Sequence, residues 1–340
     1  MSAPQPTKVP AVRRRRPTRV QVLRWAEAYA LVGVLVAVCV FFSVLPATAN
    51  VFPTTTNLQV VIGNQAVIAI IALAALIPLV CEELDLSVGA AAGLSSIFVA
   101  SVLSNGTPII VSILVGVGIG VAIGSINALI ITRLRVSAVV TTLAMATILD
   151  GITQQKTGGL SVVSQIPTAV TDFGSATTFG IPRTVFVLAA VAIGVYVLLA
   201  HAPVGRYLYA RGSNPEAARL AGLRTSLLLG FAFGASGALA GAAGVLQVAR
   251  AGGADPRVGD TFTLPALTAA FLSAASIKPG KFNVGGTLVA IFLLAALNSG
   301  LNLAGAPTYV TNYVNGGALL IGVATAVALG RKRLGDSTAL

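Results

Sequence analysis

Ten stretches of this sequence are predominantly apolar and about as long as a helix must be to cross a lipid bilayer. A helix rises about 1.5 Å per residue, so about 20 residues span a hydrocarbon core roughly 30 Å thick. Backbone N–H and C=O groups find no water there and must bond within the segment, which favours helices. The sequence therefore predicts an all-α polytopic membrane protein with about ten transmembrane helices. The ten segments are residues 26–45, 58–80, 86–103, 108–131, 138–155, 182–200, 227–248, 262–277, 284–303 and 310–329.

Prolines modify two of these segments. Pro78 lies near the end of the second segment and predicts a break in the helix before Leu84. The eighth segment is short and bounded by Pro265 and Lys278, so we expect a half-span or a strongly tilted helix there.

The distribution of basic side chains tests this topology. Only 9% of the residues are charged, whereas soluble domains carry about a quarter. If the N-terminus is cytoplasmic, 18 of the 22 Lys and Arg residues fall in inner segments. This asymmetry follows the positive-inside rule and predicts an even number of spans with both termini in the cytoplasm. The four outer residues are Lys156, Arg183, Arg250 and Arg257.

The same pattern predicts three regions. We expect a basic cytoplasmic N-terminal tail at residues 1–25, a transmembrane domain at residues 26–330, and a cytoplasmic C-terminal tail at residues 331–340. The basic N-terminal tail should contact anionic lipid. Nucleic acid is not an expected partner, because the other basic residues gather at the ends of apolar segments.

The sequence offers no catalytic or metal-binding constellation. His201 is the single histidine, and Cys39 and Cys81 match no metal-binding spacing, so we interpret both cysteines as small core residues. No Gly-x-x-x-x-Gly-Lys-Ser/Thr motif occurs, since Gly280-Lys281-Phe282 lacks the first glycine and the hydroxyl residue. We therefore expect no metal and no cofactor on this chain. If ATP powers its activity, the ATPase must be another chain.

A short polar segment, residues 207–223, separates the sixth apolar segment from the seventh. Asn214 is a favourable N-cap, Pro215 takes the first helical position, Glu216 complements the helix dipole, and Gly222 ends the helix about two turns later. A helix this short requires a packing partner. On spacing alone, an interfacial helix that merely joins two spans is an equal interpretation. The apolar residues for one face are Ala217, Leu220 and Ala221, and Arg219 suits the other face.

The run Gly-Ser-Asn-Pro-Glu-Ala-Ala-Arg-Leu-Ala-Gly at residues 212–222 resembles the coupling-helix loop of bacterial ABC importer permeases of the ribose/xylose/galactose branch. The likeness extends from about Leu58 to Arg333. It includes Leu-Asp-Leu-Ser-Val-Gly (84–89), Asn-Ala-Leu-Ile-Ile-Thr-Arg-Leu-Arg (127–135) and Leu-Asn-Ser-Gly-Leu-Asn-Leu (297–303). The coupling residues that it implies are Gly212, Asn214, Pro215, Glu216, Ala217, Ala218, Arg219 and Gly222.

This resemblance implies the type II ABC importer permease fold, with residues 205–224 as a cytoplasmic coupling loop docked on an ATPase. The implied function is the permease subunit of an ATP-driven importer in the bacterial plasma (inner) membrane. Its cargo would be a monosaccharide or a similar small, polar, uncharged solute. The implied partners are a second copy of the permease in a homodimer, a cytoplasmic ABC ATPase and an extracytoplasmic solute-binding protein.

Three features depart from the family that the chain resembles. Asp150 stands where relatives often carry Arg, 12 residues into a span, where a bare carboxylate costs about 2.5–3.5 kcal/mol. The run Cys81-Glu82-Glu83 replaces glycines, and residues 276–282 replace a more glycine-rich loop. These departures leave the identity of the solute open.

Polar side chains inside the apolar segments are the candidates for the translocation path, because each needs a partner or water. Asn298 and Asn302 are four residues apart and share one face of a helix. Neutral amides and hydroxyls suit an uncharged, hydroxyl-rich solute better than an ion. Hydrogen bonding between helices is the alternative role. The candidates are Asn64, Gln65, Asn127, Thr141, Thr142, Asn298 and Asn302.

Two segments carry stripes of glycine at helical spacing. Small residues let helix backbones approach closely, so these stripes predict tight packing inside the bundle in preference to a direct role in transport. The stripes are Gly116, Gly120 and Gly124 in the fourth segment, and Gly230, Gly234, Gly237, Gly241 and Gly244 in the seventh.

A mixed-charge cluster in a predicted external loop is the candidate contact for the solute-binding protein, with ordinary solvated charges as the alternative. Its members are Arg250, Asp255, Arg257 and Asp260. The rival function is a secondary transporter or channel for a small polar solute without an ATPase. Ion coupling needs an ionisable or carbonyl-rich site near the midplane, and Asp150, the one ionisable candidate for such a site, lies off-centre.

Overall fold

A computed structural model describes residues 19–336, with side chains described for residues 28–327. Over this range the chain is helical, apart from connecting loops, an isolated antiparallel bridge between Val162 and Ala254, and one two-stranded antiparallel hairpin, β1 (Thr177–Thr178) with β2 (Ile181–Pro182). The predicted all-α class is confirmed. The helices are α1 (Arg19–Val44), α2 (Thr55–Val80), α3 (Val88–Ser104), α4 (Ile109–Arg133), α5 (Ala138–Thr157), α6 (Thr168–Ser175), α7 (Arg183–Ala200), α8 (Pro203–Ser213), α9 (Pro215–Leu220), α10 (Thr225–Ala251), α11 (Val258–Leu272), α12 (Val284–Leu303) and α13 (Thr308–Asp336).

Each of the ten predicted segments coincides with a helix, namely α1 to α5, α7 and α10 to α13. Within the described residues, seven helical stretches are long and apolar enough to cross a membrane: α2, α4, α7, α10, α12, residues 258–275 and residues 308–327. The apolar stretches of α1 and α3 are shorter, and α5 is rich in Thr and Gln. The apolar pattern therefore located the helices, and the number that cross the membrane stays a prediction.

The eighth segment differs from the prediction. Pro265 lies inside α11, and a 3-10 turn at Ser273–Ala275 extends the helix to an 18-residue stretch that starts at Val258. The proline therefore does not bound the segment. Its missing N–H removes one backbone bond, which a membrane helix tolerates where other helices surround it. α11 is surrounded in this way, since it packs against α13, α2, α3 and α12.

Helix α2 forms the centre of the bundle. Every side chain from Ala69 to Val80 is buried, and the helix packs against α10, α11, α12 and α7. Pro78 lies in its last turn, and the chain leaves the helix at Cys81 and becomes helical again at Val88. The predicted break is confirmed and comprises residues 81–87.

The two predicted glycine stripes pack against each other, which joins α4 to α10. A Cβ at Gly120 would lie 2.0 Å from the carbonyl oxygen of Gly237, and a Cβ at Gly237 would lie 2.0 Å from that of Gly120. The backbones are therefore in direct contact, and the predicted packing role is confirmed at these positions. Gly230 and Gly234 differ, because a Cβ at either would meet no atom within 4 Å.

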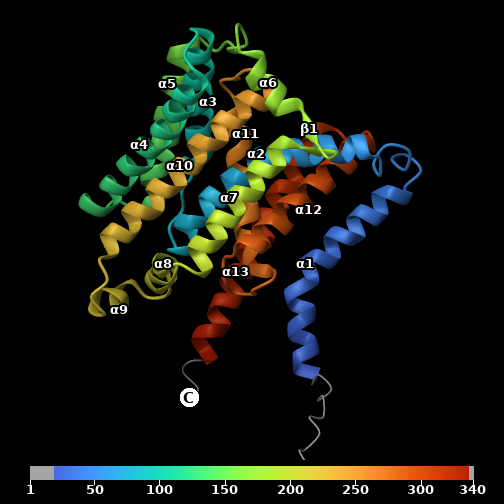
Figure 1. Ribbon diagram of the computed structural model, residues 1–340. Coiled ribbons are helices and arrows are strands. Elements are labelled where there is room, and N and C mark those ends of the chain that lie inside the picture. Colours follow the sequence, from blue (N-terminus) through green and yellow to red (C-terminus); the bar gives the residue numbers. More distant parts are fainter. Residues whose placement is uncertain (1–18, 337–340) are drawn as a thin grey trace, which may run out of the picture.

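Both described ends of the chain lie at one end of the bundle. Figure 1 shows the far ends of α1 and α13 on the side of α8 and α9, with α6 and the hairpin on the opposite side. An even number of crossings would give this arrangement. Residues 1–18 and 337–340 of the predicted tails lie outside the described residues, and α13 continues past residue 331 to Asp336.

Candidate functional site

The predicted coupling loop folds as two short helices, α8 and α9, that lie outside the main bundle (Figure 1). Asn214 lies between them in an extended conformation, and its Oδ1 accepts a hydrogen bond from the Ala217 N–H at 3.0 Å. Pro215 begins α9, and Gly222 follows it with a φ of 84°, which glycine adopts without steric cost. The predicted helix and its caps are confirmed, while its coupling role stays a prediction.

Helix α9 exposes most of its surface. Ala218 is its single buried residue, whereas Leu220 is 85% exposed. The predicted apolar face of Ala217, Leu220 and Ala221 therefore does not pack on this chain. A leucine this exposed on a six-residue helix is instead available to a partner.

Helix α8 is tied to the end of α2 by an ion pair. Arg211 Nη2 lies 2.7 Å from Glu83 Oε1, with the two side chains only 10% and 23% exposed. Arg211 Nη1 also donates to the Cys81 carbonyl oxygen. A Cβ at Gly212 would lie 2.2 Å from the Val80 carbonyl oxygen, so glycine permits this close approach. Glu83, in the acidic run after α2, therefore anchors the loop that carries α9.

The break between α2 and α3 contains a buried polar network that the sequence did not predict. Asp85 is 3% exposed and accepts hydrogen bonds from the Ser87 N–H (3.1 Å), Ser87 Oγ (2.6 Å) and Ser236 Oγ of α10 (3.0 Å). Asn127 of α4 donates from Nδ2 to Ser87 Oγ at 2.9 Å. The network therefore fixes the break against α4 and α10.

The seven predicted path residues do not form one site within this chain. Leu86 N–H donates to Thr142 Oγ1 at 3.0 Å, so one candidate supports the break directly. Three candidates are buried beside the break, near the junction of α4 with α5: Asn127, Thr141 and Thr142. Four lie on other parts of the bundle: Asn64 and Gln65 on α2, and Asn298 and Asn302 on α12.

Three of the seven candidates hold a buried oxygen that has no hydrogen-bond partner among the described residues. These atoms are Asn127 Oδ1, Thr141 Oγ1 and Asn298 Oδ1. Buried polar atoms are normally paired, so each of these acceptors is chemically open to a hydroxyl group or water. Asn64 and Asn302 are exposed on this chain, so their side chains do not need a partner within it.

The predicted mixed-charge cluster is gathered around the loop between α10 and α11. Asp255 accepts hydrogen bonds from the Arg257 N–H (2.8 Å) and from Ser161 Oγ (3.1 Å). The carboxyl group of Asp260 interacts with that of Asp150, which places this aspartate of α5 beside the loop. The four members are Arg250, which is half-buried, and Asp255, Arg257 and Asp260, which are exposed.

The remaining single-residue predictions concern groups outside these sites. Cys81 is buried as predicted, whereas Cys39 is only half-buried. His201 follows α7 and contacts the edge of Tyr196, with 5.3 Å between ring centroids. Among the described residues, no three His, Cys, Asp or Glu side chains gather as a metal site would require.

Seven helical stretches in the described part of the chain, long and apolar enough to cross a membrane and packed around a buried polar network, indicate a multi-pass integral membrane protein. Residues 57–324 match the family described as "Branched-chain amino acid transport system / permease component", and the chain belongs to it. It is therefore a multi-pass inner-membrane protein and the permease subunit of an ABC importer. ATP hydrolysis occurs on a separate chain, and the family implies an ATPase and a solute-binding protein as partners.

Individual relatives cover most of the chain. The "Ribose import permease protein RbsC" of Escherichia coli (strain K12) is 31% identical over 296 residues, which cover 85% of this chain and 91% of the relative. The protein of the same name from Haemophilus influenzae is 30% identical over 88% of this chain and 94% of its own. The "Autoinducer 2 import system permease protein LsrD" of Yersinia pseudotuberculosis (strain IP 31758) is 30% identical over 75% and 78%. No solved structure matches.

Proposed function

We propose that this permease moves a monosaccharide, or a similar small, polar, uncharged solute, into the cytoplasm. The relatives named for ribose and autoinducer 2 import support this class of cargo. The observation that carries ATP-driven coupling in this proposal is α9, an exposed helix that directly follows α8, which the Arg211–Glu83 ion pair holds to the membrane bundle. In this proposal, α9 docks on the ATPase and the ion pair transmits its movement.

The proposed topology has ten spans, with both termini and α9 in the cytoplasm. The 18 inner basic residues against four outer ones support this orientation. The proposed boundaries are a basic tail at residues 1–25 in contact with lipid, the permease domain at 26–330 and a C-terminal tail at 331–340. Two copies of the chain form the proposed translocation unit, and no cofactor is required on either.

The proposed path uses neutral polar groups. Asn127 Oδ1, Thr141 Oγ1 and Asn298 Oδ1 are acceptors without described partners, and sugar hydroxyl groups are hydrogen-bond donors. Asn64, Gln65, Thr142 and Asn302 complete the proposed lining. Weak, neutral contacts of this kind release cargo readily, so we place most of the selectivity in the solute-binding protein.

The proposed contact with the solute-binding protein is the charged loop between α10 and α11. Exposed rim charges steer association and depend on salt. Reversing Arg257 should therefore weaken docking most at low ionic strength. An affinity that stays unchanged across a salt series would remove this loop from the interface.

A pair of matched leucine variants tests the function. Leu220 and Leu134 are 85% and 70% exposed, on α9 and on the loop between α4 and α5. In proteoliposomes with the ATPase and binding protein, Leu220→Asp should reduce ATP-driven sugar uptake about tenfold or more, because a charge replaces an apolar docking contact. Leu134→Asp should retain uptake within about twofold. Equal uptake by both variants would refute docking through α9.

A labelling experiment tests the orientation. A cysteine at Leu220 should resist a membrane-impermeant maleimide in intact cells and react in inside-out vesicles. Bound ATPase should then protect it. Labelling from the outside of intact cells would overturn the proposed topology and, with it, the docking role of α9.

A further inference from the structure

A cavity of about 520 Å³ lies between α7, α8 and the beginning of α12. None of the seven path candidates lines it, and Tyr209 is its one lining residue from the predicted coupling loop. Its walls are aliphatic. Ala192, Ile193 and Leu199 contribute from α7, and Val284 and Leu288 from α12. A space of this size with such walls accommodates hydrocarbon, and it is far larger than a water molecule requires.

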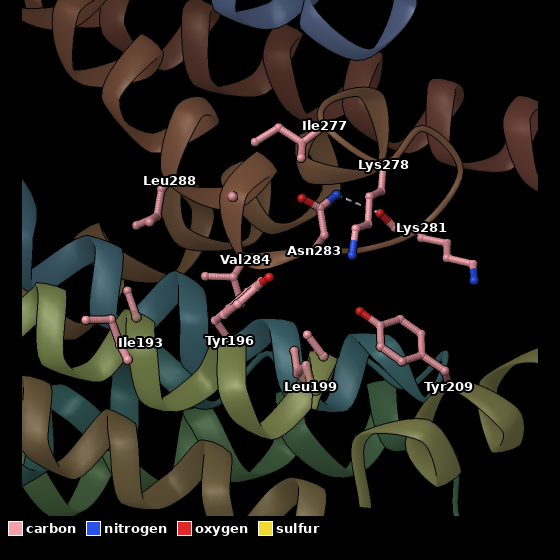
Figure 2. A pocket seen from close by; sticks show the side chains of 13 residues that line it. Ile193, Tyr196, Leu199, Tyr209, Ile277, Lys278, Lys281, Asn283, Val284 and Leu288 are labelled. Atoms are coloured by element: carbon pink, nitrogen blue, oxygen red, sulfur yellow. Dashed lines mark hydrogen bonds between the residues drawn. The ribbon is translucent and has the colours of Figure 1, made fainter. Parts of the chain in front are cut away.

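The rim of the cavity is polar and basic. Figure 2 shows the Lys278 side chain and the hydroxyl groups of Tyr196 and Tyr209 directed toward the same space, with Lys281 at its edge. Neither lysine forms an ion pair with any side chain in the described part of the protein. The cavity therefore combines an apolar interior with two cations that no described residue neutralises.

The segment that carries the lysines is held rigidly. Asn283, which is 7% exposed, donates from Nδ2 to the carbonyl oxygens of Ser276 (3.0 Å) and Lys281 (2.9 Å). Tyr209 donates from its hydroxyl to the Phe282 carbonyl oxygen at 2.6 Å. Burial raises the pKa of Tyr209 to about 12, so the phenol keeps the proton that it donates. These contacts give a fixed form to the loop of residues 276–282.

The cavity lies where the membrane meets water. Tyr196 is near the end of α7 and half exposed, the position at which aromatic side chains anchor helices in the interface. Lys278 and Lys281 precede α12 on the side of the bundle that carries α8. In the proposed orientation this is the cytoplasmic leaflet, whose anionic lipids attract basic groups.

We propose that this cavity binds an anionic phospholipid of the cytoplasmic leaflet. The phosphate accepts hydrogen bonds from Lys278 and Tyr196, since the proton of Tyr209 is committed to Phe282. Lys281 adds charge at the rim, and an acyl chain lies along Ile193, Leu199 and Leu288. The leaflet rests on the orientation in the proposed function, whereas the site itself rests only on the cavity and its charges.

The test measures lipid retention on the full-length permease, with and without its ATPase, by native mass spectrometry. The probe is phosphatidylglycerol mixed with phosphatidylcholine. We expect one phosphatidylglycerol per chain to survive delipidation. A basic residue near the membrane surface strengthens the binding of anionic lipid by about 1 kcal/mol, which is about fivefold in affinity. Replacing both lysines, Lys278→Gln with Lys281→Gln, should therefore lower phosphatidylglycerol retention about 25-fold. The matched control, Arg133→Gln with Arg135→Gln, removes two exposed cations on the same side of the bundle and should change retention little.

A second variant separates the cavity from surface charge. Ile193→Trp keeps both lysines and fills the space that the acyl chain would occupy, so it should also lose the lipid. Retention by Ile193→Trp, or an equal loss in the arginine control, would reduce the effect to surface charge and overturn the site. If glycerol 1-phosphate alone displaced the bound phosphatidylglycerol, the protein would recognise the head group without the acyl chain. That result would also overturn the proposed lipid site.

A further outcome would assign the lysines to another partner. If the lysine variant binds the ATPase more weakly but retains phosphatidylglycerol as the arginine control does, the lysines contact the ATPase and the proposal fails. Lipid retention is measured without transport. A failed lipid site therefore leaves the import proposal intact, and a failed import assay leaves the lipid result intact.

Discussion

The ion pair between Glu83 and Arg211 is the contact whose removal should be most informative. Its atoms are 2.7 Å apart, and the side chains are 10% and 23% exposed. Breaking a fully buried pair costs about 3–5 kcal/mol, and exposed pairs contribute about 0.2–1 kcal/mol. This pair lies between those limits. We expect Arg211→Met to lower the unfolding free energy by about 2 kcal/mol, because it leaves the Glu83 carboxylate half-buried without a counter-charge.

The double variant distinguishes a true coupling from two separate effects. Glu83→Gln and Arg211→Met should be non-additive by about 1 kcal/mol or more when unfolding is measured in mixed micelles. The exposed Glu216–Arg219 pair on α9, at 3.1 Å and about 70% exposure, is the matched control and should show little coupling. In proteoliposomes, Arg211→Met should retain ATPase binding but lower the sugar moved per ATP hydrolysed. Strict additivity of the first pair, together with unchanged transport stoichiometry, would refute the reasoning.

Three further predictions use the same assays. Gly120→Ala should cost about 3 kcal/mol or prevent folding, since its Cβ would lie 2.0 Å from a backbone oxygen, whereas Gly118→Ala meets open space and should be tolerated. Asp85→Leu should destabilise by about 3 kcal/mol, because it leaves three donors of the network unpaired, and Asp85→Asn should cost less than half of that. Asn298→Leu with Asn302→Leu should slow uptake without changing which sugar is preferred, provided that insertion and ATPase binding are normal. Uptake at the wild-type rate would assign these amides to helix packing.

The helices could be predicted because membrane insertion imposes a length and a polarity that are local in sequence. The caps of α9 were predictable for the same reason, since Asn214 bonds to a backbone group three residues away. The glycine stripes indicated that each helix packs closely on another, but the sequence did not say which helices pack together. The structure shows that the stripe of α4 packs on the stripe of α10. Pro265 misled the prediction because a proline weakens an isolated helix, whereas the helices around α11 support it.

The polar network was not predictable, because its partners are distant in sequence. Glu83 and Arg211 are separated by 128 positions, and Asp85 and Ser236 by 151. One signal was available: a carboxylate directly after an apolar span requires buried donors. That signal marks Asp85 as a residue that needs partners, but it does not say which helix supplies them. The exposure of the apolar face of α9 was likewise undetermined, because a short amphipathic helix can pack on its own chain or on another.

The break at residues 81–87 links the two ends of the proposed mechanism. Glu83 pairs with Arg211 on α8, and two residues later Asp85 accepts hydrogen bonds from Ser87 and from Ser236 on α10. A displacement of α8 must therefore either break the ion pair or pull on the segment that holds Asp85. Because that segment is not helical, it can change its backbone angles without shortening α2 or α3. A force applied at α9 would consequently reach α4 and α10 through seven residues of non-helical chain, and the rigid contact between those two helices would carry it into the bundle.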